Sequence, residues 1–159
     1  MQMKLKGRSV AKGVAAGKAL VSRQRISFLG AVEPTTGVVV DKTHDLYGKG
    51  VASRVLVFPG GKGSTVGSYV IYQLKKHGKS PAAMVILDRS ADTIVAVGAI
   101  IAEIPAVDSV ELKLELELEL GAGAAEGEGG RGLLRDGEGG LLRDGEEVVV
   151  NADEGYIEF

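Results

Sequence analysis

The stretch VLVFPGGKGSTVGSYVIY, from Val55 to Tyr72, decides the fold because a buried strand, a Gly-rich turn and a helix start follow one another in it. The apolar run at its beginning predicts a strand, which the Pro and Gly residues after Phe58 end. Hydrophobic residues then recur at helical spacing, which places Ser64 and Thr65 at or near the helix N-cap. Unpaired backbone N–H groups and a positive helix dipole favour an anion there. The stretch therefore predicts a site as well as a strand–turn–helix unit.

Three familiar Gly-rich or nucleophile motifs do not match this turn. A Walker phosphate loop needs Ser or Thr directly after Gly-Lys, but Gly63 follows Lys62. A dinucleotide fingerprint needs a third glycine where Val66 stands. A nucleophile elbow needs glycine two residues before Ser64, where the sequence has lysine. The turn must be interpreted in another way.

The wider sequence alternates between strands and helices. Apolar runs predict strands at 3–10, 14–22, 38–40, 53–58, 84–87 and 104–107, and helical patterns cover 65–77 and 91–102. This alternation predicts an α/β fold with parallel strand pairs. Two short runs, 147–151 and 156–159, flank an Ala-Asp-Glu-Gly turn and predict a C-terminal β-hairpin.

The segment at about 109–145 has a different character. From Val110 to Leu120 apolar and charged residues alternate strictly, which predicts a half-buried strand. A Gly-rich tract follows, and then GLLRDGE occurs twice, beginning at Gly132 and at Gly140. We interpret the segment as a low-complexity insert within a single domain that spans 1–159.

Composition excludes several classes of function. The chain has 159 residues, 45% of them hydrophobic, and a net charge of −2, so it has no general attraction to nucleic acid or to an anionic membrane. It shows no membrane-spanning run and no signal-peptide core, so we expect a cytoplasmic protein. With no cysteine, the chain has no disulfide and no thiolate ligand for zinc or an iron–sulfur cluster. Although Asp41 and Asp45 flank His44, only two histidines are present, which favours a structural turn over a metal site.

The turn Gly61-Lys62-Gly63-Ser64-Thr65 resembles the G-x-G-S-S/T turn in the mobile domain of the aconitase superfamily. The chain is most similar to the swivel domain, or small subunit, of the aconitase X group. Agreement extends over about three quarters of the chain: it includes the block at 30–70, KSPAAMVI from Lys79, residues 91–108 and the terminal DGEEVVVNADEGYIEF. The resemblance implies a swivelling β/β/α domain with mixed and parallel strands.

The resemblance also implies an activity and a site. The expected reaction is the dehydration of (R)-5-phosphomevalonate to trans-anhydromevalonate 5-phosphate, in the modified archaeal mevalonate pathway for isoprenoid biosynthesis. Ser64 would be the catalytic base, and Gly61, Lys62, Gly63 and Thr65 would bind the small phosphorylated hydroxy-acid substrate. The family usually has arginine at the position of Lys62, so the positive charge is kept but a bidentate donor is lost.

A larger aconitase X-type subunit is implied as the partner in a heterodimer. It would carry an iron–sulfur cluster whose iron takes the leaving hydroxyl as a Lewis acid, while this chain alone would bind no cofactor or metal. Two alternatives stay open. The chain could serve a related enzyme such as cis-3-hydroxy-L-proline dehydratase, or it could be a non-catalytic swivel domain that binds an anion, with Ser64 acting only as a helix cap.

Overall fold

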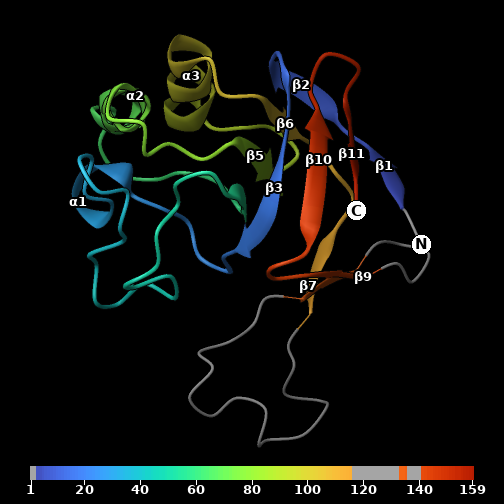
Figure 1. The fold of residues 1–159 in the computed structure, drawn as a ribbon, viewed down its shortest axis with the longest axis horizontal. Helices are drawn as coiled ribbons and strands as arrows, with labels where there is room; N and C mark the ends of the chain where they lie inside the picture. Colours follow the sequence, from blue (N-terminus) through green and yellow to red (C-terminus); the bar gives the residue numbers. More distant parts are fainter. Residues whose placement is uncertain (1–2, 116–132, 136–140) are drawn as a thin grey trace, which may run out of the picture.

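The fold is a mixed α/β domain whose computed structural model describes residues 3–115, 133–135 and 141–159. Figure 1 shows the three helices on one side of the central strands, and the strands that carry the two ends of the chain on the other side. In chain order the elements are β1 (Lys4–Lys6), β2 (Arg8–Ala11), β3 (Val14–Val21), α1 (Phe28–Ala31), β4 (Val55–Phe58), α2 (Gly67–Lys76), β5 (Ala83–Ile86), α3 (Thr93–Ala102), β6 (Ala106–Asp108), β7 (Lys113–Glu115), β8 (Leu133–Arg135), β9 (Leu141–Arg143), β10 (Glu147–Asn151) and β11 (Tyr156–Glu158).

The centre of the domain is a parallel layer made of β3, β4, β5 and β6. Every residue of β4 is buried, and because successive side chains of a strand point to opposite faces, β4 contributes to two cores. Leu56 and Phe58 pack in the cluster that contains the residues of α2 and α3. Val55 and Val57 pack in a second cluster, shared with β10 and β11. The layer is therefore covered on both faces, as parallel sheets usually are.

The second core is enclosed because the sheet curls back on itself. Its eight strands run in the order β1-β11-β10-β3-β4-β5-β6-β2. The strands at the two ends of this order, β1 and β2, are separated in the chain by Gly7 alone, whose N–H donates to the carbonyl oxygen of Gly155 at 2.8 Å. The predicted single strand at 3–10 is thus two strands, which join the opposite ends of the sheet.

Most of the other predicted elements are confirmed. The parallel pairing, the two long helices and the C-terminal hairpin of β10 and β11 are present. The helix after the Gly-rich turn begins at Gly67, two residues later than predicted. The predicted strand at 38–40 is wrong, since Val38 and Val39 form only isolated bridges within the long loop between α1 and β4. That loop folds mainly through tight turns, so its apolar residues enter the core without forming a ladder.

Both ends of the predicted insert, 109–145, contribute to the second core. Val110 and Leu112 precede β7 and are 3% and 7% exposed, and Leu142 of β9 is fully buried. Strand β8 pairs antiparallel with both β7 and β9. Of the alternating run from Val110 to Leu120, the structure assigns residues 113–115 to a strand, whereas residues 116–132 and 136–140 lie outside the described residues. The ends of the segment are therefore part of the folded domain.

Candidate functional site

The Gly-rich turn lies where β4 ends and α2 has not yet begun, at the carboxyl edge of the parallel strands. In open α/β sheets this edge is where ligands usually bind. Residues 62–66 of the turn are exposed, whereas Gly60 and Gly61 are buried beneath them. The turn thus has a fixed base and an accessible tip.

Two neighbouring segments hold the base of the turn. Ile26, in the segment that follows β3, donates its N–H to the carbonyl oxygen of Gly60 at 3.1 Å and accepts the N–H of Lys62 at 3.2 Å. From the other side, Asp92 accepts the N–H of Gly61 at 2.7 Å and, with its second oxygen, caps α3 by accepting the N–H of Val95 at 3.1 Å. The turn is therefore attached to both the β3 segment and α3.

Glycine is required at two positions of the turn, for different reasons. A Cβ atom on Gly61 would lie 2.8 Å from Cγ2 of Val95 and 2.9 Å from a carboxylate oxygen of Asp92, so only glycine permits this approach. Gly63 has a φ of +83°, which disfavours other residues, and a Cβ there would lie 2.5 Å from Oγ of Ser27. The two glycines let the backbone turn sharply just before Ser64.

Ser64 presents its hydroxyl at the exposed tip. Its Oγ accepts the N–H of Val66 at 3.1 Å, and its carbonyl oxygen accepts the N–H of Gly67 at 2.9 Å. The N-cap of α2 is Val66, so Ser64 caps a tight turn just ahead of the helix rather than the helix itself. Among the described residues, none accepts the backbone N–H groups of Gly63, Ser64 and Thr65. Three consecutive donors beside one hydroxyl can stabilise an anion or an oxyanion.

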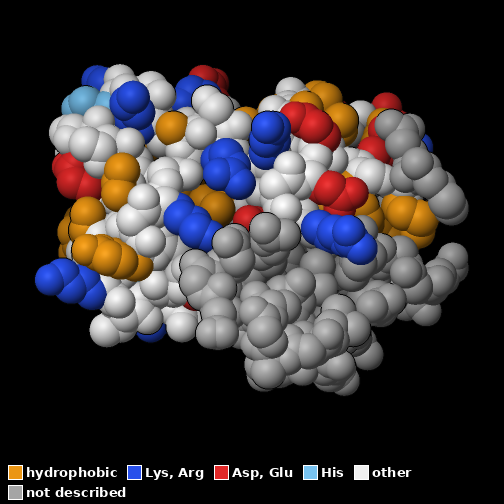
Figure 2. Space-filling view, turned by 60° about the horizontal axis from the view of Figure 1, so that its bottom comes forward, with side chains coloured by type: hydrophobic (Ala, Val, Ile, Leu, Met, Phe, Trp, Pro, Cys, Tyr) orange, Lys and Arg blue, Asp and Glu red, His pale blue; other side chains and the backbone are white. Residues whose placement is uncertain are grey.

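The predicted site residues thus lie together, in one turn of five residues from Gly61 to Thr65. Lys62 is exposed, and its positive charge helps to hold the pKa of Asp41 below the ordinary range, although hydrogen bonds from Thr43 are the main cause. Figure 2 shows Lys and Arg side chains interspersed with hydrophobic and acidic ones on the face turned forward. The roles assigned to the five residues remain predictions.

Sequence reasoning missed several residues that shape this site. Asp92 could have been found, since it is the second residue of the helix predicted at 91–102, and aspartate near the start of an apolar helix is a typical N-cap. No sequence pattern indicated that Ser27 lies against Gly63. Arg25 forms an ion pair with Asp88 at 2.8 Å, and its guanidinium lies 2.8 Å from where a Cβ on Gly60 would be. These contacts join residues far apart in the sequence, which no local pattern indicates.

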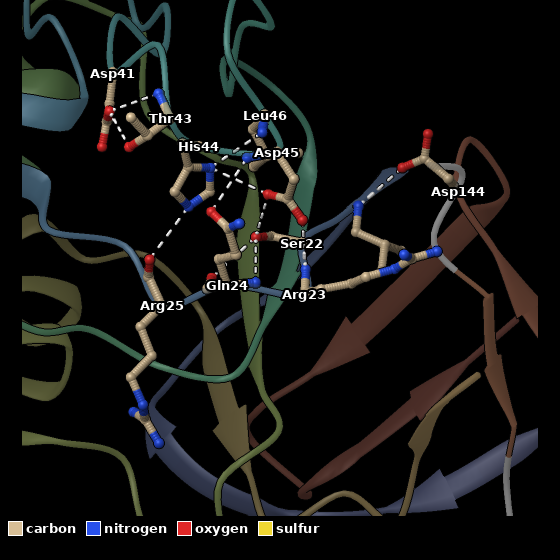
Figure 3. A network of polar contacts seen from close by, with 11 residues as sticks. Ser22, Arg23, Gln24, Arg25, Asp41, Thr43, His44, Asp45, Leu46 and Asp144 are labelled. Atoms are coloured by element: carbon tan, nitrogen blue, oxygen red, sulfur yellow. Dashed lines mark hydrogen bonds and ion pairs between the residues drawn. The ribbon is translucent and has the colours of Figure 1, made fainter. Parts of the chain in front are cut away.

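His44 is buried in a polar network that links the long loop to the segment after β3, as Figure 3 shows. Its Nε2 lies 3.2 Å from the carbonyl oxygen of Arg25, and its Nδ1 accepts the N–H of Leu46 at 3.0 Å. The same Nδ1 lies 3.1 Å from Oδ1 of Asp45. The carboxylate of Asp45 also accepts the hydroxyl of Ser22 and the N–H of Arg23, both at 2.8 Å. The predicted structural turn is therefore present, and it is tied to the site's surroundings.

The His44–Asp45 pair should make stability depend on pH. When His44 is protonated, Nδ1 can donate a hydrogen bond to Asp45, and this raises the pKa of His44 by more than burial lowers it. Burial of Asp45 acts to raise its pKa, but hydrogen bonds from His44, Arg23 and Ser22 lower it overall. A raised folded-state pKa stabilises the protein below about pH 6.5, and this contribution is lost as the pH rises through the folded-state pKa of His44.

We therefore expect the free energy of unfolding of the wild type to fall, relative to His44→Gln, as the pH rises from about 5.5 to about 8.5. Urea unfolding followed by circular dichroism at a series of pH values measures this difference. Parallel pH profiles for the two proteins would contradict the expected ion pair.

The sequence of this chain has no thiolate with which to bind an iron–sulfur cluster, because it contains no cysteine. In the part of the chain that the structure describes, no group of three or more His, Asp or Glu residues could hold a metal ion. The described residues also include no helix with the length and apolar character needed to cross a membrane.

Comparison with known proteins identifies the class of protein that this fold and turn define. Residues 4–128 match the family model of the aconitase X swivel domain, and the chain belongs to that family. A solved structure, the holo form of aconitase X from Thermococcus kodakaraensis, superposes with a TM-score of 0.76 at 44% identity, over 98% of this chain and 97% of that chain.

Among relatives, the chain is similar to phosphomevalonate dehydratase small subunits. It is 49% identical to the protein of Methanosarcina acetivorans over 156 residues, which cover 98% of this chain and 90% of the relative. It is 63% identical to that of Methanothrix thermoacetophila over 108 residues, which cover 68% of this chain and 77% of the relative. The similarity to the first relative thus extends through the C-terminal hairpin.

Proposed function

We propose that this chain is the small subunit of a phosphomevalonate dehydratase, a hydro-lyase, and that it supplies Ser64 as the catalytic base. The observation that carries this proposal is the exposed Ser64 hydroxyl beside three consecutive backbone N–H groups, those of residues 63–65, which no described residue accepts. Close similarity to small subunits of that name supports the choice of reaction. The term small subunit in the names of these relatives supports the existence of a larger partner subunit. We propose that the two subunits act together in the cytoplasm.

The dehydration requires a base at one carbon and a leaving group at the next. In the proposed step, Oγ of Ser64 takes a proton from the carbon beside the substrate carboxylate. The electron pair of that C–H bond forms the new double bond, and the hydroxyl on the adjacent carbon leaves with its bonding pair. An isolated serine hydroxyl is far too weakly acidic to act as its alkoxide near neutral pH, so the oxyanion must be stabilised. The N–H groups of residues 63–65 can do this.

The remaining residues of the turn would bind and orient the substrate. Lys62 is an exposed cation next to the free N–H groups, and it complements either the phosphate or the carboxylate of the substrate. Gly61 and Gly63 fix the path of the backbone, and Thr65 contributes a backbone N–H and a hydroxyl. Because the turn is open, a second subunit is needed to enclose the substrate and exclude water. That subunit would also supply every ligand of an iron–sulfur cluster.

The substrate is tested by assembling this chain with the large subunit of a phosphomevalonate dehydratase. We expect the purified complex to dehydrate phosphomevalonate and to leave cis-3-hydroxy-L-proline unchanged, because the relatives that this chain resembles over most of its length are phosphomevalonate dehydratase small subunits. Product formation followed by mass spectrometry distinguishes the two substrates. Dehydration of hydroxyproline alone would assign the chain to a related enzyme. A complex that binds phosphomevalonate without converting it would favour a non-catalytic swivel domain.

A further inference from the structure

The segment from Ser22 to Ser27 connects two parts of the site that are far apart in the chain. At its start it is bound by Asp45, which accepts the Ser22 hydroxyl and the Arg23 N–H. At its end Ile26 is hydrogen-bonded on both sides of Gly61. In the middle of the segment, the carbonyl oxygen of Arg25 lies 3.2 Å from Nε2 of His44 (Figure 3). His44 therefore contacts Arg25, the residue directly before Ile26, which holds the Gly-rich turn.

We infer that His44 is a positioning residue for the turn that bears Ser64, and that it acts through the carbonyl oxygen of Arg25. The inference rests on the proposed function for its catalytic consequence. The geometry itself is independent of that function, because it concerns only where the backbone of residues 60–62 is held.

Packing and hydrogen bonds hold the imidazole of His44 in one position. It is 7% exposed, and the next residue but one, Leu46, is 1% exposed and anchors the loop in the main core. The carbonyl oxygen of Arg25 can only accept, so Nε2 carries a proton in this contact, while Nδ1 accepts the N–H of Leu46 in the neutral ring and faces the carboxylate of Asp45. Asp45 and Asp41 are the acidic groups that act on this ring. With the ring held on one side, its other nitrogen fixes the position of the Arg25 carbonyl.

A displacement of the Arg25 carbonyl would displace the backbone of the Gly-rich turn by a similar amount. Ile26 follows Arg25 directly, and its two hydrogen bonds to Gly60 and Lys62 set the register of the turn against the β3 segment. The base of the turn is buried, so it cannot adjust by moving into solvent. A displacement of about 1 Å at reacting groups can lower a rate about 10²-fold. Loss of the His44 contact should therefore act on turnover more than on substrate binding.

Two isosteric variants separate the roles of the two ring nitrogens. In His44→Gln the amide nitrogen can replace Nε2 and donate to Arg25 O, while in His44→Asn the side-chain oxygen can replace Nδ1 and accept from Leu46. We expect the Gln variant to retain kcat within about 3-fold of wild type, and the Asn variant to lose about 10-fold or more with little change in KM. Thr43→Ala, an exposed change in the same loop, is the matched control.

Activity is measured in the complex with the large subunit, and the turn is followed separately in this chain alone. In ¹⁵N NMR spectra, the amide signals of Gly61 and Lys62 should shift in the Asn variant and stay near their wild-type positions in the Gln variant. Equal effects of Gln and Asn on both readouts would overturn the inference. Shifted amides with unchanged kcat in the Asn variant would refute the link to catalysis.

Two further measurements keep the test decisive. If the Asn variant does not fold, the imidazole ¹⁵N signals of His44 in the wild-type chain show which ring nitrogen carries the proton. A neutral ring without a proton on Nε2 could not donate to Arg25 O, and this result would overturn the inference. Full activity of Ser64→Ala would refute the proposed function instead, and would leave the amide shifts of Gly61 and Lys62 as the test of positioning.

Discussion

Replacement of Ser64 by alanine is expected to lower kcat of the assembled complex by roughly 10²–10⁴, the usual scale for the loss of an acid–base group. Alanine removes the hydroxyl oxygen that is proposed to take the proton, while the glycines and the backbone N–H groups of residues 63–65 stay in place. Substrate binding should change little, because Lys62 and the backbone donors are retained. The rate is measured with saturating large subunit and compared with wild type.

The structural cost of the same change is small and can be separated from the catalytic one. Oγ of Ser64 accepts one hydrogen bond, from the exposed Val66 N–H, so its loss should lower the free energy of unfolding by about 0.5–1.5 kcal/mol. Thr65→Ala is the matched control for this structural cost, since it removes a neighbouring hydroxyl from the same exposed turn. If Ser64→Ala turned over as fast as wild type, the hydroxyl would be left with a structural role only.

The isolated chain is expected to show no dehydration of phosphomevalonate above the uncatalysed rate, and to gain full activity when the large subunit is added. Ser64 lies in an exposed turn, where water competes for every hydrogen bond that would stabilise its oxyanion. The sequence also lacks the thiolates that would hold a cluster. A titration of this chain with large subunit, followed by product formation, measures the dependence.

The same titration has a built-in control. With the Ser64→Ala chain, the large subunit should assemble to the same extent by size-exclusion chromatography yet give little product. Dehydration by the purified chain alone would contradict a divided active site and would require a complete catalytic apparatus within these 159 residues.

The order of most elements and the position of the candidate site follow from local sequence. The apolar run at Val55–Phe58 and the glycines after it predict a buried strand and a sharp turn, because short-range sterics and burial alone decide both. The candidate site residues are consecutive, so the sequence places them together without any knowledge of the fold. The start of α2 was less well predicted, since Ser64 and Thr65 both suit a cap but the helix begins only at Gly67.

Only the tertiary structure decided what surrounds that turn. The division of the N-terminal run at Gly7, which joins the two ends of the sheet, depends on pairing with β6 and β11, about a hundred residues or more away in the chain. The attachment of the turn by Ile26 and Asp92, and the buried position of His44 beside Arg25, likewise depend on long-range contacts. The sequence by itself determined the chemistry that the turn can offer. The fold determined where that chemistry is held, because hydrogen bonds between distant segments form only once the two cores have brought those segments together.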